Sequence, residues 1–275
     1  MMGDWIEAMM AATAWGMEKP EAYGPFHLIA TGIGLALSIF LAYRLRGISE
    51  RGNRILLFSV GMFLLLTEAY KQLFHTFYLS EHTYNYSIFP FQLCSVPMYL
   101  CIITAFLKDG RLRQGMFHFM TTYNLLGGLI SFAEPSGLSH AYVTLTLHAF
   151  VWHMTLVFVG LYLIASGRYA KTWADYRSAT VTFLVLAVIA FGINLIFWEP
   201  SGGKINMFFV GPRNSSLAVF KDIAKAYGWY VSTALYLPAV CLGALLVFWP
   251  AHRHAKYGRI LPVFRKKTKT QTTEN

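Results

Sequence analysis

Four polar side chains lie inside one apolar run, residues 55–79. They are Glu68, Lys71, Gln72 and His75. Positions i, i+3, i+4 and i+7 of a helix share one face, so we expect the four to point the same way. A charge at membrane depth costs several kcal/mol unless it is paired or hydrated. This face therefore either forms a Glu68–Lys71 pair that holds helices together, or lines a polar cavity for a charged head group or for proton handling.

A cysteine lies near the start of the next apolar run, residues 86–107. The sequence over residues 89–97 is Phe-Pro-Phe-Gln-Leu-Cys-Ser-Val-Pro, which places the thiol at Cys94. If this run is one helix, Cys94 lies at the edge of the face that carries Gln92, and Pro97 is expected to kink the helix just after the cysteine. A membrane cysteine is most often a small hydrophobic residue. The alternative is a nucleophile in a pocket that the kink shapes.

Two histidines lie in the apolar run 142–166. His148 is six residues from the start of its run, and Cys94 is eight residues from the start of its own. At about 1.5 Å per residue, the two side chains differ in depth by only about 3 Å. His153 points about 140° away from His148 around the helix, so His148 is the better candidate for chemistry at Cys94. His75 also lies near the same end of its helix.

The composition favours a membrane protein. The 275 residues are 56% hydrophobic and only 13% charged, roughly half the charged fraction of soluble domains, so the chain lacks the polar residues to cover a water-exposed surface. The three cysteines lie within apolar runs and are odd in number, which argues against a disulfide framework. Seven apolar stretches approach the ~20 residues that span a bilayer: 24–43, 55–79, 86–107, 115–133, 142–166, 179–198 and 227–248. The sequence predicts an all-α, polytopic bundle of seven transmembrane helices within residues 24–249.

The basic residues predict how this bundle is oriented. Lysines and arginines concentrate in the first, third and fifth connections and in the tail 250–275, whereas residues 1–23 are acidic overall. By the positive-inside rule the N-terminal segment is extracytoplasmic and the basic tail is cytosolic. The net charge of +10 is spread over loops rather than over one face, so nucleic acid is not an expected partner and the lipid bilayer is. No His/Asp/Glu spacing suggests a metal site, and no cofactor is expected.

The sixth connection, residues 199–226, is the longest. Its middle is apolar and contains Asn206, and Arg213 follows closely. The stretch near 205–220 is expected to be an interfacial or re-entrant segment tucked against the bundle, or else an ordinary external loop. With Asn206 included, the polar groups inside the apolar runs all fall in the outer half of the predicted bundle. The sequence therefore predicts a one-sided pocket around Cys94.

The motif at residues 89–95 resembles the Leu-Pro-Leu-x-Leu-Cys-Ser pattern of the YwaF-type bacterial integral membrane proteins. That family is related to the transmembrane-protein-164-type ether-phospholipid acyltransferases of eukaryotes. The polar second run, the histidines of the fifth run and the segment at Asn206 are also similar, and the resemblance extends from about His27 to Phe248. This chain departs at Phe89 and Phe91, where leucine is commoner.

The resemblance implies a cysteine-dependent acyl transfer between glycerophospholipids, with Cys94 as the essential cysteine. Cys94 would attack a phospholipid ester and hold the acyl group as a thioester, and His148 or His75 would accept and return the proton. Gln92 or a backbone N–H would stabilise the oxyanion, and Lys71 and Arg213 would hold phosphate. The candidate substrate-binding residues are Lys71, Glu68, Gln92, Asn206, Arg213 and His153. The partners would be a phospholipid or lysophospholipid, and the location a bacterial cytoplasmic membrane.

Three non-enzymatic interpretations compete with this one. A retinal protein needs a lysine in its last helix, and residues 227–248 contain none. A lipid transporter or scramblase would use Glu68, Lys71 and His75 as a track for head groups, but it would need polar groups in both halves of the bundle. A ligand-sensing seven-helix protein would leave Cys94 dispensable.

Overall fold

The computed structural model describes residues 2–257, and most of these residues are helical. Within this range there is no strand, and a single isolated bridge joins Gly16 to Tyr142. Five of the described helices are long and apolar enough to cross a membrane, so the chain is a multi-pass integral membrane protein. They are α2 (Pro25–Leu45), α3 (Glu50–Leu73) with its π-helical extension η1 (Phe74–Leu79), α7 (Val143–Ala165), α8 (Trp173–Ile196) and α10 (Trp229–Tyr257).

The other two predicted spans have a different form. The expectation of one continuous helix over residues 86–107 is wrong, because a short 3₁₀ turn, η2 (Tyr86–Ile88), is followed by non-helical residues and α4 (Val96–Phe106) begins late. Pro97 lies in the first turn of α4 and starts the helix instead of kinking it, as its missing N–H and fixed φ favour. Over residues 111–133, α5 (Arg111–Phe119), the π-helical η3 (Met120–Asn124) and α6 (Leu125–Ala133) run end to end.

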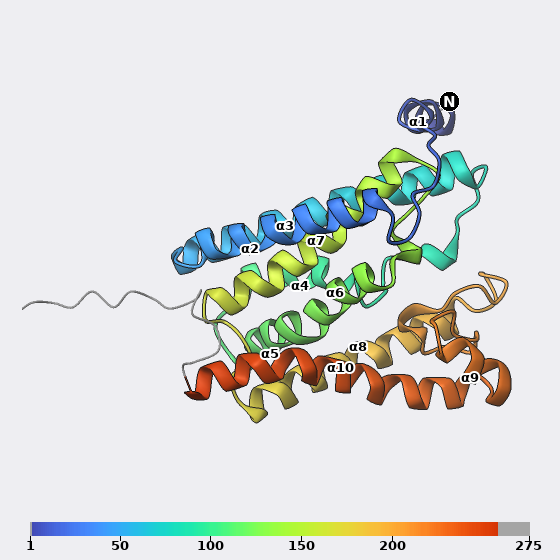
Figure 1. Cartoon of the computed structure of the whole chain (residues 1–275). Coiled ribbons are helices and arrows are strands. Elements are labelled where there is room, and N and C mark those ends of the chain that lie inside the picture. Colours follow the sequence, from blue (N-terminus) through green and yellow to red (C-terminus); the bar gives the residue numbers. More distant parts are fainter. Residues whose placement is uncertain (1, 258–275) are drawn as a thin grey trace, which may run out of the picture.

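The helices run along a common axis in three groups (Figure 1). In this view α2, α3 and α7 lie along one side, α8 and α10 lie along the opposite side, and α4, α5 and α6 lie between them. The N-terminal α1 (Met2–Ala11) and the short α9 (Phe220–Tyr227) lie at one end of the bundle, and α10 finishes at the other. We call the first the Cys94 end and the second the Glu50 end, after residues described below.

Close packing brings α3 against α4. A Cβ atom on Gly61 would lie 2.6 Å from the Cγ1 of Ile102 and 2.9 Å from its backbone nitrogen, so only glycine allows this approach. At the Cys94 end, α1 packs on the extension of α3, where Met10 contacts Phe74 and Leu145 in a small buried cluster. These contacts fix the part of α3 that carries the polar side chains.

The segment around residues 205–210 is buried inside the bundle. Ile205, Met207 and Phe208 are fully buried, and a 3₁₀ turn, η5 (Met207–Phe209), forms here. The ring of Phe208 stacks 6.2 Å from Phe183, which stacks 4.6 Å from Tyr123 in the core. This segment is therefore part of the core that faces the motif at residues 89–95.

The helix α10 continues beyond the predicted boundary at residue 249. Arg253 and Lys256 lie on its last turns, because the helix passes through Pro250 and ends at Tyr257. The remaining basic residues of the predicted tail, within 258–275, lie outside the described residues.

Candidate functional site around Cys94

The polar face of α3 forms one connected cluster. The Nζ of Lys71 lies 2.8 Å from the Oε1 of Glu68, and the amide of Gln72 donates to the same oxygen at 2.6 Å. Gln72 also donates to the carbonyl of Ile88 at 2.7 Å, which connects α3 to the loop before Cys94. Glu68 is only 3% exposed, so its charge is balanced by Lys71 rather than by water.

Cys94 lies in a tight turn immediately before α4. The N–H of Ser95 donates to the carbonyl of Gln92 at 2.8 Å, and the indole of Trp152 donates to the carbonyl of Cys94 at 3.0 Å. In the described part of the chain, the backbone N–H of Leu93 donates to no protein acceptor, and the N–H of Cys94 interacts with its own thiol. These two amide donors flank the thiol at the positive end of a helix, an arrangement that suits a developing negative charge.

The surroundings of the thiol act on its ionisation in opposite directions. Cys94 is partly buried and packs against a cluster formed by Leu64, Met98, Trp152 and Leu156. This burial raises the pKa of the Cys94 thiol, whereas the Lys71 ammonium lowers that pKa and the Glu68 carboxylate raises it. Lys71 is the charge that favours the thiolate.

The histidines gather near Lys71 rather than on the thiol. The ring of His148 lies 5.4 Å from the ring of Trp152, and its Nε2 is buried without a partner. His148 lies within electrostatic range of Lys71 and His75. Over residues 2–257, neither histidine forms a hydrogen bond with the Cys94 sulfur.

His153 lies on the other side of α7. Its Nδ1 lies 2.8 Å from the carbonyl oxygen of Ala149, and its ring lies edge-on to Phe132 of α6 at 6.4 Å. The structure thus separates His153 from His148, as the helical periodicity predicted, and Trp152 links only the His148 side to Cys94.

Two amide side chains hold the buried segment at residues 205–210. Gln92 donates to the carbonyl of Asn206 at 3.0 Å and accepts from the N–H of Phe208 at 3.0 Å. Asn194 makes the same kind of pair with Met207, donating at 2.9 Å and accepting at 2.6 Å. Phe208 and Phe209 have positive φ angles of 54° and 55°, so these bonds hold a backbone conformation that bulky residues rarely adopt.

Asn206 and Arg213 belong to the same loop. The amide of Asn206 donates to the carbonyl of Arg213 at 3.3 Å, and its Oδ1 is buried without a partner. The exposed guanidinium of Arg213 donates to the carbonyl of Lys204. Of the residues selected from sequence, the structure groups Glu68, Lys71, His75 and His148 with Cys94, and it joins Gln92 to Asn206.

A sequence model described as the TMEM164 family matches residues 22–249. The chain belongs to the TMEM164 family. No curated protein and no solved structure matches it. The matched range contains every candidate residue named above. Outside it lie α1 with the connection to α2, the last turns of α10 and the C-terminal tail.

Two residues of this TMEM164-family site escaped the sequence reasoning. Asn194 is fully buried. It is a lone amide within an apolar run, and this feature of the sequence indicates a buried polar contact. His140 lies just before α7, within range of Lys71, and burial holds the pKa of its imidazole below the usual value, with Lys19 acting in the same direction. It lies outside the apolar runs, so hydropathy gives no sign that its side chain is buried.

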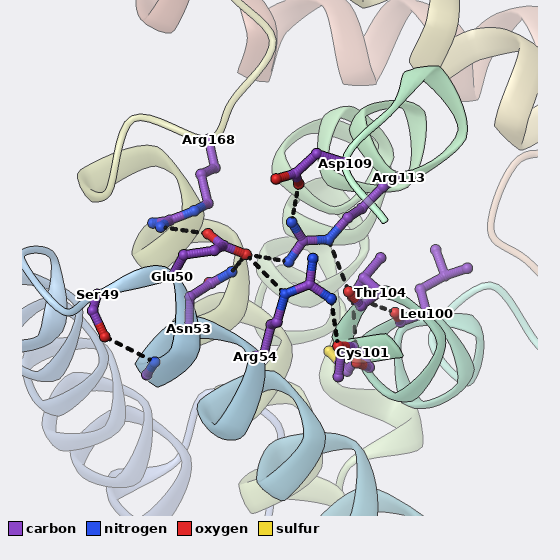
Figure 2. A network of polar contacts seen from close by, with 12 residues as sticks. Ser49, Glu50, Asn53, Arg54, Leu100, Cys101, Thr104, Asp109, Arg113 and Arg168 are labelled. Carbon is purple, nitrogen blue, oxygen red and sulfur yellow. Dashed lines mark hydrogen bonds and ion pairs between the residues drawn. The ribbon is translucent and has the colours of Figure 1, made fainter. Parts of the chain in front are cut away.

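A second polar network lies at the Glu50 end (Figure 2). The carboxylate of Glu50 lies 2.6 Å from Arg113, 3.0 Å from Arg168 and 3.4 Å from Arg54. Arg113 is only 1% exposed and also donates to the carbonyl of Thr104 at 2.8 Å. The prediction of a one-sided set concerns polar groups inside the apolar runs, and this network lies at helix ends just outside those runs. Sequence alone does not reveal that charged residues of the connections are brought together at these ends.

Proposed function

We propose that this TMEM164-family chain is a membrane-embedded acyltransferase that moves an acyl group between glycerophospholipids through Cys94. The observation that carries the proposal is the turn at residues 92–95, in which a thiol within electrostatic range of the Lys71 ammonium is flanked by the backbone N–H groups of Leu93 and Cys94. A nucleophile, a charge that favours its anion and donors for an oxyanion are the parts that acyl transfer needs. The family assignment supports a membrane setting for this chemistry.

The first half-reaction forms a thioester. Cys94 gives its proton to a base, and the thiolate attacks the carbonyl carbon of a phospholipid ester. The oxygen of the tetrahedral intermediate accepts hydrogen bonds from the N–H groups of Leu93 and Cys94. When the ester C–O bond breaks, the leaving lysolipid oxygen takes a proton from the protonated base, and the acyl group remains on sulfur.

The second half-reaction reverses these steps with a new acceptor. The hydroxyl of a lysophospholipid gives its proton to the same base and attacks the thioester carbonyl. The C–S bond breaks, and the thiolate is regenerated and reprotonated. Atoms and charges balance with no added cofactor.

His148 or His75 serves as the base in this proposal. Both lie near Lys71, and His148 contacts Trp152, whose indole holds the Cys94 carbonyl. Catalytic hydrogen bonds are often long before substrate binds and shorten in the complex, so the base is expected to meet the thiol when lipid is present. Glu68 and Lys71 orient each other, and Lys71, Asn206, Arg213 and His153 remain proposed contacts for the lipid.

The proposal extends to the membrane setting. We propose that the chain crosses the membrane seven times, with its N-terminus outside the cytoplasm and its C-terminus in the cytosol. The membrane of this proposal is a bacterial cytoplasmic membrane, as for the YwaF-type proteins. The separation of α1 and the end of α10 to opposite ends of the bundle supports an odd number of crossings.

Comparative lipidomics tests the function. Membranes containing the wild-type chain should differ in acyl composition from membranes containing Cys94→Ala, while Cys241→Ala, which changes a partly buried cysteine on α10, should behave like wild type. Equal protein levels and equal thermal stability confirm that the variants are folded. If wild type and Cys94→Ala give the same acyl composition, a lipid transporter becomes the better reading, which the polar networks at both ends of the bundle would then favour.

A further inference from the structure

An apolar groove runs along the seam between α3 and α7. It has a volume of about 460 Å³, which lies within the roughly 300–1,000 Å³ typical of small-molecule sites. Its walls are Phe63 and Leu66 on α3 and Leu147 and Val151 on α7. Because both helices are candidate membrane spans, the groove opens sideways toward the hydrocarbon of the bilayer.

The groove has a polar end and an apolar end. At the Cys94 end, the hydroxyls of Thr13 and Tyr70 lie 2.8 Å apart, and Thr144 donates to the carbonyl of Thr13 at 3.2 Å. From Tyr70 to Phe63 the groove extends about 10 Å along α3, at 1.5 Å per residue, and its lining there is apolar except for Thr67, whose hydroxyl donates to the Leu64 carbonyl of its own helix. Hydroxyls at one end and hydrocarbon along the rest match a lipid with its ester near the Cys94 end and its chain pointing inward.

His148 connects the groove to the candidate nucleophile. Its side chain lines the groove, and its Nε2 is buried without a hydrogen-bond partner among residues 2–257. An unpaired buried nitrogen is costly unless a ligand or water satisfies it. One turn along α7, Trp152 packs on the His148 ring and donates to the carbonyl of Cys94. Leu64 of α3 belongs to the same buried cluster, so Cys94 lies directly behind this seam.

A second groove, between α2 and α7, lacks these features. It holds about 390 Å³ and is lined by apolar residues such as Ile33, Leu37 and Phe158. Among the described residues that line it, none has an unpartnered buried nitrogen, whereas His148 supplies one to the α3–α7 groove. The contrast singles out the α3–α7 groove.

We propose that the α3–α7 groove binds one acyl chain of the glycerophospholipid substrate, which enters sideways from the bilayer and brings its ester to His148 and Cys94. This inference rests on the proposed function, because it assigns a chain site to the same reaction. It also makes a prediction about lipid binding that does not depend on the chemistry.

Native mass spectrometry of the purified full chain tests the binding. After delipidation, the protein is titrated with 1-palmitoyl-2-oleoyl phosphatidylethanolamine. Wild type should bind one molecule tightly, and Leu66→Trp, which fills the groove from α3, should weaken that binding about tenfold, the loss expected when about two methylene groups are no longer buried. Leu246→Trp is the matched control, since Leu246 is 75% exposed on α10, away from the groove.

The outcomes separate the two proposals. Cys94→Ala should bind the lipid like wild type, because the thiol does not line the groove. If wild type binds lipid in the groove but transfers no acyl group, the proposed lipid site is supported and the proposed acyltransferase activity is rejected. Binding that Leu66→Trp leaves unchanged, binding that Leu246→Trp weakens equally, or no tight binding by wild type would each overturn the groove.

Discussion

The sulfur of Cys94 lies between opposing influences. Partial burial and the Glu68 carboxylate raise the pKa of the thiol, and only the Lys71 ammonium among the neighbouring side-chain charges lowers it. A thiol held in this way forms its nucleophilic thiolate more readily as pH rises. The charge balance on α3 thus controls the reactivity of a residue on the segment before α4.

Replacing Lys71 tests this electrostatic control. In Lys71→Gln the ammonium that favours the thiolate is lost, so the pKa of Cys94 should rise further. The rising limb of the pH–rate profile for acyl transfer should therefore move to higher pH. Lys225→Gln, at an exposed position on α9, is the control. If the pH–rate profile of Lys71→Gln matches that of wild type, Lys71 does not lower the pKa of Cys94.

The two histidines of α7 offer a matched comparison. His148→Ala should reduce the transfer rate far more than His153→Ala, by about 10²-fold or more if His148 is the general base. The reason is position: His148 contacts Trp152 beside Cys94, whereas His153 faces Phe132. Initial rates in proteoliposomes measure the effect. Equal losses in the two variants would argue against His148 as the base.

At the scale of elements, the segment at residues 205–210 depends on polar side chains from two other segments. Gln92 and Asn194 each complete a pair of backbone hydrogen bonds with it. The 3₁₀ turn of the segment contributes backbone bonds of 3.3 and 3.4 Å, and the two amides add four shorter ones. Gln92 therefore fixes the turn of Cys94 to the core.

Removing the Gln92 amide should loosen this connection. Gln92→Ala leaves the Phe208 N–H unpaired, at about 1–3 kcal/mol for a buried group, and leaves the Asn206 carbonyl with only the 3.4 Å bond from the N–H of Phe209. The midpoint of thermal unfolding should fall clearly. Gln114→Ala, at an exposed position on α5, should leave it nearly unchanged. Similar midpoints for the two variants would contradict a role for Gln92 in holding the segment.

The Glu50 network joins helix ends that are distant in sequence. Glu50→Gln removes the shared partner of three guanidinium groups, including the buried Arg113. Breaking a fully buried ion pair costs about 3–5 kcal/mol; because the Glu50 side chain is 42% exposed, we expect about 2 kcal/mol. Thermal unfolding measures this loss, with the exposed Glu199→Gln as control. No change on replacing Glu50 would show that solvent already screens the network.

At the scale of the whole molecule, periodicity and composition predicted the helical membrane fold well. Hydrophobic length identified all five long spans, because a bilayer requires a run that composition alone reveals. It failed over residues 86–107, where the residues around Pro90 are non-helical and α4 begins only at Val96, with Pro97 in its first turn.

The candidate site was predictable only in part. Depth and helical face grouped Lys71, His75 and His148 with Cys94, because those quantities follow from spacing along each helix. Three features depend on how distant segments pack, and residue spacing does not predict that packing. They are the pairing of Gln92 with the segment at Asn206, the contacts of Asn194 and the Glu50 network.

The central claim is that Cys94 carries the acyl group. Purified protein is incubated with phospholipid in the absence of an acceptor, quenched in acid, digested and analysed by mass spectrometry. The account predicts an acyl adduct on the peptide that contains Cys94, removed by neutral hydroxylamine and absent from Cys94→Ser. Acyl transfer that continues in Cys94→Ser, or that proceeds in wild type with no adduct on Cys94, would contradict it.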